Sequence, residues 1–140
     1  MNYFEKMDIN ANELSPLVLA YMGDCVYEMM VRTYVVNQGN RPVNKMNSMT
    51  RSFVNAGAQS DMYDIIKDSL TEEEHTVYKR GRNAKSHTMA KNQTVVNYRR
   101  ATGVEALFGY LYIKGEFDRL SELFELGRKG LEENHEKTRH

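Results

Sequence analysis

The sequence lacks several features that define whole classes of protein. It has a single cysteine, Cys25, which excludes an internal disulfide framework and a zinc site built from several cysteines. It also has no N-terminal apolar stretch with a cleavage site, and no uninterrupted run of the roughly 18 apolar residues that a membrane helix requires. We therefore expect a cytoplasmic protein with no membrane partner.

The chain has no net charge either, because 19 lysines and arginines balance 19 aspartates and glutamates. The overall charge therefore gives no indication of a nucleic-acid partner. The local distribution differs, since residues 79–100 contain seven basic residues and no acid, whereas residues 116–136 contain seven acids and three bases. This pattern predicts a dipolar molecule with one strongly basic stretch.

Confident strand signals are also missing, since pairs of β-branched residues occur only inside helical patterns. Ser15 and Pro16 are typical of a helix start, and the apolar residues that follow as far as Val36 cover nearly every face, which predicts a central helix. Apolar periods predict further helices after Pro42, from Ser60, from Thr71, over 94–100 and 102–115, and over 116–136, with an exposed loop at 81–93. Thr71 and Glu74 have the spacing of a capping box, and a break is expected at Thr102 and Gly103. The last helix carries an apolar stripe of Phe117, Leu120, Leu123, Phe124 and Leu131. We expect a single all-α domain over residues 1–140.

Asp24 interrupts the apolar run LAYMGDCVYEMMVR at residues 19–32. An ionised carboxylate buried without a partner is strongly destabilising or acquires a raised pKa, so the fold must supply a partner. Two interpretations are open: an aspartate that accepts a hydrogen bond from a distant basic or tyrosine side chain, or a ligand of a divalent metal ion. Glu28, on the same helix face, is better interpreted as a solvated or ion-paired residue. Cys25 is interpreted as a core residue.

Glu105 is a second lone acid, at the start of the apolar segment TGVEALFGY. Its spacing from Thr102 is that of a capping box, which by local rules alone is the better interpretation. Small residues, Gly23 and Gly109 among them, lie beside both acids and would let two helices approach closely. Converging carboxylates suit Mg²⁺, which takes one or two protein carboxylates and retains several waters, one of which could act as a nucleophile.

The basic stretch is the third candidate site. It is open to the ordinary interpretation of a solvated surface, but the absence of any acid, the neutral donors within it and Gly81 for a close backbone approach favour contact with phosphates. It lacks the aromatic interleaving that a platform for single strands needs, so contact with a duplex backbone is favoured. The expected RNA-binding residues are Lys79, Arg80, Arg82, Asn83, Lys85, Ser86, Lys91, Arg99 and Arg100.

Two segments together resemble a known family. LAYMGDCVYEMMVR resembles the signature helix of ribonuclease III, and ATGVEALFGYLYIKG resembles a later helix of the same catalytic domain. We expect no double-stranded-RNA-binding domain after Gly130, and this form is similar to the small Mini-ribonuclease III branch of the family. The resemblance implies an all-helical homodimer that uses Mg²⁺, with Asp24 as the signature aspartate and Glu105 as the essential helix glutamate.

The sequence departs from full-length ribonuclease III where that enzyme carries further acids and this chain has Leu17, Ala20 and Thr102. The site is thereby reduced towards two carboxylates, with Glu28 and Thr102 as accessory candidates. The resemblance implies a Mg²⁺-dependent endoribonuclease that cleaves double-stranded regions of precursor 23S ribosomal RNA and leaves 5′-phosphate and 3′-hydroxyl ends. A ribosomal protein that shapes this RNA is a further candidate partner. The alternative is a non-catalytic RNA-binding helical dimer that acts as a ribosome-assembly scaffold.

Overall fold

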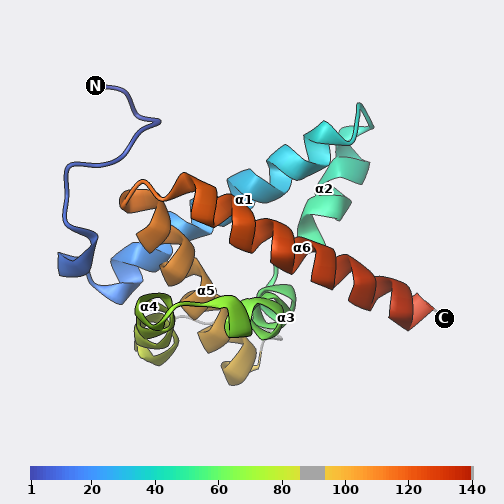
Figure 1. Cartoon of the computed structure of the whole chain (residues 1–140). Coiled ribbons are helices and arrows are strands. Elements are labelled where there is room, and N and C mark those ends of the chain that lie inside the picture. The colour runs from blue at the N-terminus through green and yellow to red at the C-terminus, as the bar shows by residue number, and fades with distance from the viewer. Residues whose placement is uncertain (86–93, 140) are drawn as a thin grey trace.

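The computed structural model describes residues 1–85 and 94–139, and all of the regular structure in them is helical (Figure 1). The prediction of an all-α fold is therefore confirmed. The helices are α1 (Pro16–Asn37), α2 (Val43–Arg51), α3 (Ala56–Ile66), α4 (Glu72–Asn83), α5 (Val95–Ile113) and α6 (Phe117–Arg139), with short 3₁₀ turns η1 (Ala11–Glu13) and η2 (Lys67–Ser69). The central helix is α5, which contacts α1, α3, α4 and α6.

Helix α1 begins where the sequence predicts. The Ser15 hydroxyl accepts a hydrogen bond from the Val18 amide at 3.2 Å, and Pro16 occupies the first turn. The prediction that this helix is buried on nearly every face is wrong, because its neighbours cover only one side. We call the remaining side the exposed α1 face. Its apolar members are Leu17, Val18, Tyr21, Cys25 and Met29, and it also carries the polar residues Asp24, Glu28 and Arg32. The prediction that Cys25 is a core residue is therefore wrong as well.

Helix α5 is continuous, so the predicted break at Thr102 and Gly103 does not exist. Thr94 caps the helix, and its hydroxyl accepts a hydrogen bond from the Asn97 amide at 3.0 Å. Thr102 lies inside the helix, where its hydroxyl donates to the Tyr98 carbonyl at 3.0 Å. The capping-box interpretation of Glu105 is therefore wrong, since residues three apart also share one face in a helix interior.

Close packing explains the glycines that suggested a break and a loop. A Cβ on Gly103 would lie 2.5 Å from the ring of Tyr78 in α4, and one on Gly81 would lie 2.6 Å from the Cβ of Ala106 in α5. These glycines let α4 and α5 cross at short range. Gly81 therefore serves helix packing and not the predicted approach to nucleic acid, and the loop predicted from residue 81 begins only after Asn83.

Capping side chains set the starts of α3 and α4. Asn55 caps α3, so this helix begins at Ala56, earlier than predicted. The capping box predicted for α4 is confirmed, because the Thr71 amide donates to the Glu74 carboxylate at 2.9 Å and the Glu74 amide donates to the Thr71 hydroxyl at 3.1 Å. The same carboxylate accepts a hydrogen bond from Arg119 at 2.8 Å, which ties α4 to α6.

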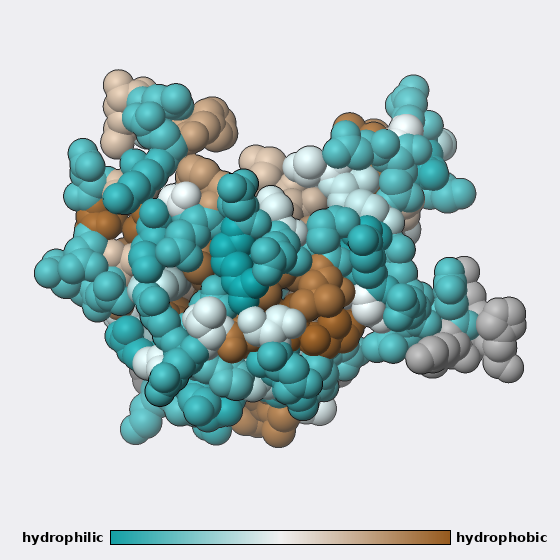
Figure 2. All heavy atoms as spheres, viewed as in Figure 1, coloured by the Kyte–Doolittle hydropathy of each residue, from teal (hydrophilic) through white to brown (hydrophobic). Residues whose placement is uncertain are grey.

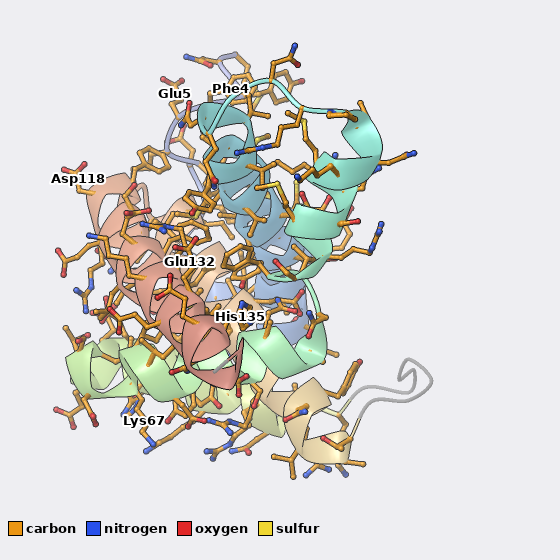
Figure 3. All side chains as sticks on the ribbon, turned by 90° about the vertical axis from the view of Figure 1, so that its right-hand side faces the viewer. Phe4, Glu5, Lys67, Asp118, Glu132 and His135 are labelled. Atoms are coloured by element: carbon orange, nitrogen blue, oxygen red, sulfur yellow. The ribbon has the colours of Figure 1, made fainter. Side chains whose placement is uncertain are left out.

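Helix α6 crosses the front of the molecule in Figure 1. Figure 3 shows Glu132 on the side of α6 that faces α1 and α2, and Tyr34 of α1 donates a hydrogen bond to it. The guanidinium of Arg128 lies 4.3 Å from the centre of the Tyr34 ring. These contacts join the outer parts of α1 and α6. Four residues of the predicted apolar stripe of α6 are buried: Leu120, Leu123, Phe124 and Leu131. The fifth, Phe117, is exposed.

The core combines aliphatic and aromatic side chains, with Tyr27 and Phe108 fully buried. The Tyr27 hydroxyl donates to the Phe53 carbonyl at 2.9 Å, so its polar atom has a partner inside the core. Most of the face seen in Figure 2 is hydrophilic, with a few separate apolar patches. Among the described helices, none combines the length and the apolar character needed to cross a membrane.

Candidate active site

The two predicted acids lie where α1 and α5 come into backbone contact. A Cβ on Gly23 would lie 1.6 Å from the Glu105 carbonyl oxygen, and one on Gly109 would lie 2.0 Å from the Leu19 carbonyl oxygen. Nothing larger than a hydrogen atom fits at either position. The prediction that small residues let the two helices approach is confirmed, and this contact brings Asp24 beside Glu105.

The carboxyl groups of Asp24 and Glu105 share a hydrogen bond. Burial raises the pKa of Glu105 to about 8, with help from the hydrogen bond and the negative charge of Asp24. At neutral pH Glu105 therefore keeps its proton. The sequence suggested that Asp24 was the acid in a buried setting, but Asp24 is exposed and Glu105 is the partly buried one. The distant basic or tyrosine partner considered for a buried Asp24 is thus unnecessary.

The donor set of this pair fits Mg²⁺. Two carboxylates from two helices are the number and type of protein ligand that Mg²⁺ takes, because it binds oxygen and keeps several waters. In the described part of the chain, no group of three or more His, Cys, Asp or Glu side chains could hold a metal ion. Asp24 and Glu105 at the α1–α5 crossing are the residues that would hold Mg²⁺, and water and substrate would complete its coordination.

The accessory candidates make other contacts. Glu28 accepts a hydrogen bond from Arg32 at 3.2 Å within an exposed ion pair, as the simpler interpretation predicted. Thr102 uses its hydroxyl on the backbone of its own helix, as described above. Glu28 nevertheless shares a groove along the exposed α1 face with Asp24 and Tyr21. Asp24 therefore opens onto a surface that a large ligand can reach.

Sequence reasoning missed Gln59, the third side chain at the site. It lies on α3, is 5% exposed, and its amide forms a hydrogen bond with the Glu105 carboxyl group. A glutamine inside a helical pattern carries no local signal of such a contact. Only the packing of α3 against α5 identifies it.

The predicted RNA-binding residues divide into three groups. Arg82 and Arg100 lie over aromatic rings, with their guanidinium carbons 5.9 Å from the Tyr78 centroid and 5.0 Å from the Tyr63 centroid, and Arg100 also pairs with Asp64. Ser86 and Lys91 lie outside the described residues. The exposed members, at the end of α4 and the start of α5, are Lys79, Arg80, Asn83, Lys85 and Arg99.

The raised pKa of Glu105 predicts that folding stability falls with rising pH. The folded state keeps the Glu105 proton up to about pH 8, whereas the unfolded chain releases it near the ordinary value of 4.5. The contribution of this group is complete below the lower value and is lost as the pH rises through the upper one. We expect the melting temperature in EDTA to fall between about pH 4.5 and about pH 8, and Glu105→Gln to reduce this fall. Equal slopes for both proteins would contradict the raised pKa of Glu105.

Known proteins share this architecture. Residues 17–116 match the Ribonuclease III domain family. The chain is 46% identical over 137 residues to Mini-ribonuclease 3 of Thermoanaerobacter sp. (strain X514), a match that covers 95% of this chain and 96% of that protein. It is 48% identical over 124 residues to Mini-ribonuclease 3 of Clostridium tetani (strain Massachusetts / E88), with 88% and 81% covered.

A solved structure agrees. The fold is similar to the crystal structure of protein FN1578 from Fusobacterium nucleatum, with a TM-score of 0.77 and 31% identity over 84% of this chain and 94% of that chain. The carboxylate pair and the helix crossing that holds it both fall inside the matched family region. This chain therefore belongs to the ribonuclease III family of endoribonucleases that act on double-stranded RNA, within its Mini-ribonuclease 3 group.

Proposed function

We propose that the chain is a Mg²⁺-dependent endoribonuclease that cleaves double-stranded regions of precursor 23S ribosomal RNA in the cytoplasm. The observation that carries this proposal is the carboxylate pair, in which one exposed and one partly buried acid are held together by helices in backbone contact. Membership of the family supports action on duplex RNA. The choice of a ribosomal RNA precursor rests on the resemblance to Mini-ribonuclease III.

In this proposal Asp24 and Glu105 are the catalytic residues and hold the metal ion. Bound Mg²⁺ would lower the pKa of water and so supply a nucleophile near neutral pH. Glu105 must release its proton before both carboxylates can bind a cation, so metal binding is coupled to proton release. Attack at phosphorus breaks its bond to the 3′ oxygen, which leaves 5′-phosphate and 3′-hydroxyl ends.

The predicted RNA-binding residues supply the duplex-binding surface in this proposal. The exposed members at the end of α4 and the start of α5 suit the regularly spaced phosphates of a duplex, and Ser86 and Lys91 are included although they lie outside the described residues. Phosphate contacts release counterions, so affinity should fall steeply as salt increases. Arg82 and Arg100 are held by aromatic rings, which reduces the side-chain freedom that RNA binding would remove.

A homodimer is the third part of the proposal. The exposed α1 face is strongly apolar, with Tyr21 82% and Met29 56% exposed, and an apolar groove lined by Met22, Tyr112 and Phe117 continues it. Contiguous apolar surface of this kind marks a protein interface. A second copy packed there would cover this surface, and Asp24 would lie near the interface. Each protomer would then contribute one carboxylate pair, one for each RNA strand.

A cleavage experiment tests the proposal. The protein is incubated with a long RNA duplex and with precursor 23S ribosomal RNA, each with Mg²⁺ or with EDTA, and the precursor also with ribosomal proteins added. We expect cleavage of both RNAs only with Mg²⁺, and end analysis should identify 5′ phosphates and 3′ hydroxyls. Intact RNA in every sample, with RNA binding retained, would contradict the proposed cleavage activity and support the alternative of a non-catalytic RNA-binding scaffold. Cleavage of the duplex without cleavage of any precursor would contradict the ribosomal substrate.

A further inference from the structure

Gln59 is a buried polar residue beside the carboxylate pair, and it has no role in the proposed reaction as described above. Its side chain is 5% exposed, and its amide forms a hydrogen bond with the Glu105 carboxyl group. A side-chain amide N–H donates to a carboxylate oxygen. Gln59 is thus a neighbour on a third helix that can orient the Glu105 carboxylate.

The position of Gln59 is fixed from the α1 side of the site. Tyr27, one helical turn after Asp24, donates its hydroxyl to the Phe53 carbonyl at 2.9 Å. Two residues later Asn55 caps α3, and its side chain accepts a hydrogen bond from the Ala58 amide at 2.8 Å. The first turn of α3 is therefore tied to α1 directly beside the site, and Gln59 immediately follows this tied segment.

The contacts form a closed ring around the acids. From Asp24 the ring passes along α1 to Tyr27, through the Phe53 carbonyl into α3, from Gln59 to Glu105 on α5, and back to Asp24. Burial, together with the charge of Glu105, raises the pKa of Tyr27, which agrees with the closeness of these groups. Every link is either a hydrogen bond or a short stretch of chain, namely one turn of α1, residues 53–55 and the first turn of α3. The orientation of the Glu105 carboxyl group is therefore set by α3 as well as by its own helix.

An amide also suits the chemistry of this position. A lysine would donate equally well but would place a positive charge where a cation must bind, and a glutamate would add a further negative charge beside the two acids. Neutral donors that hold metal-ligating carboxylates are a recurrent feature of metal sites. Correct placement of the two carboxylates matters more in this chain, because the positions of Leu17, Ala20 and Thr102 supply no further acid.

We propose that Gln59 is a positioning residue whose amide holds the Glu105 carboxylate towards Asp24, so that both bind one Mg²⁺. This inference rests on the proposed function. Removal of the donor by Gln59→Met keeps the length of the side chain, and we expect it to weaken binding of Mn²⁺, used as a probe for Mg²⁺, by about 10-fold or more. Binding is measured without RNA by electron paramagnetic resonance of free Mn²⁺, and the Mg²⁺ concentration that half-saturates duplex cleavage should rise with it.

Two further variants separate positioning from packing. Ser60→Ala removes a polar group from the neighbouring buried position of α3, where the serine is 2% exposed, and should leave Mn²⁺ affinity unchanged. Gln59→Asn keeps the amide but shortens the side chain by one methylene, so that the donor no longer reaches Glu105, and it should weaken Mn²⁺ binding as Gln59→Met does. This second variant keeps the inference testable if Gln59→Met does not fold.

The outcomes distinguish this inference from the proposed function. A wild-type protein that binds Mn²⁺ and cleaves duplex RNA, with a folded Gln59→Met of unchanged Mn²⁺ affinity, would contradict the role of Gln59 and leave the function intact. An equal loss of affinity in Ser60→Ala would also contradict it. If Gln59→Met is unfolded, a folded Gln59→Asn with the Mn²⁺ affinity of the wild type would do the same. A wild-type protein that neither binds Mn²⁺ nor cleaves RNA would contradict both proposals.

Discussion

Asp24→Asn is expected to slow single-turnover cleavage of duplex RNA by about 1,000-fold or more, because metal catalysis contributes several kcal/mol to the transition state and each ~1.4 kcal/mol is a factor of ten. The substitution keeps the shape of the side chain and removes one of the two proposed negative ligands. Asp24 is exposed, so the fold should not change. Loss of its charge should also lower the raised pKa of Glu105, because that charge contributes to the rise.

Glu28→Gln is the matched control for this experiment. Glu28 is an acid one turn further along the same helix and opens onto the same groove, but its carboxylate pairs with Arg32. We expect this variant to cleave at nearly the wild-type rate. Affinity for duplex RNA, measured in EDTA, should be the same for both variants within a few fold. A rate for Asp24→Asn within 10-fold of the wild type, or an equal loss in Glu28→Gln, would contradict the assignment of Asp24.

Gly23→Ala is expected to destabilise the fold by about 3 kcal/mol or more, because the new methyl group overpacks a backbone contact. Its Cβ would lie 1.6 Å from the Glu105 carbonyl oxygen and 2.9 Å from the Gly109 amide nitrogen. Neither atom belongs to a flexible side chain, so the two helices must move apart. Alanine favours a helix over glycine by about 1 kcal/mol, which offsets only part of this cost. The melting temperature should fall by roughly 10 °C.

Gly57→Ala provides the comparison. Gly57 also lies in a helix, α3, but its nearest contact would be the side-chain oxygen of Asn55 at 3.3 Å. The same substitution should therefore change the free energy of unfolding by less than about 1 kcal/mol. Thermal melts and urea titrations of both variants measure the difference. A Gly23→Ala protein as stable as Gly57→Ala would show that α1 and α5 are not in backbone contact.

The helical architecture could be predicted from the sequence because its signals are local. Ser15 with Pro16, and Thr71 with Glu74, are capping patterns whose hydrogen bonds form within one turn, and both mark helix starts in the structure. The same kind of local rule failed at Thr102 and Gly103. There the glycine is required by the Tyr78 ring of another helix, and no local pattern distinguishes that role from a helix break.

The candidate site was predictable in part for the same reason. The resemblance identified two acids, and the small residues beside them indicated that their helices meet. Exposure depends on which side of α1 is covered, so the sequence could not show that Asp24 faces solvent and that Glu105 carries the raised pKa. Gln59 reaches the site from a third helix. Such a contact is decided by tertiary packing, and the spacing of residues along the chain contains no record of it.

The glycine contact between α1 and α5 also bears on the entropy of the site. The two acids are carried by helices whose main chains touch at Gly23 and Gly109, so the separation of their Cα atoms is a property of the backbone. A ligand that needs both acids at once would find their main chains already placed, and only the two side chains would lose conformational freedom on binding.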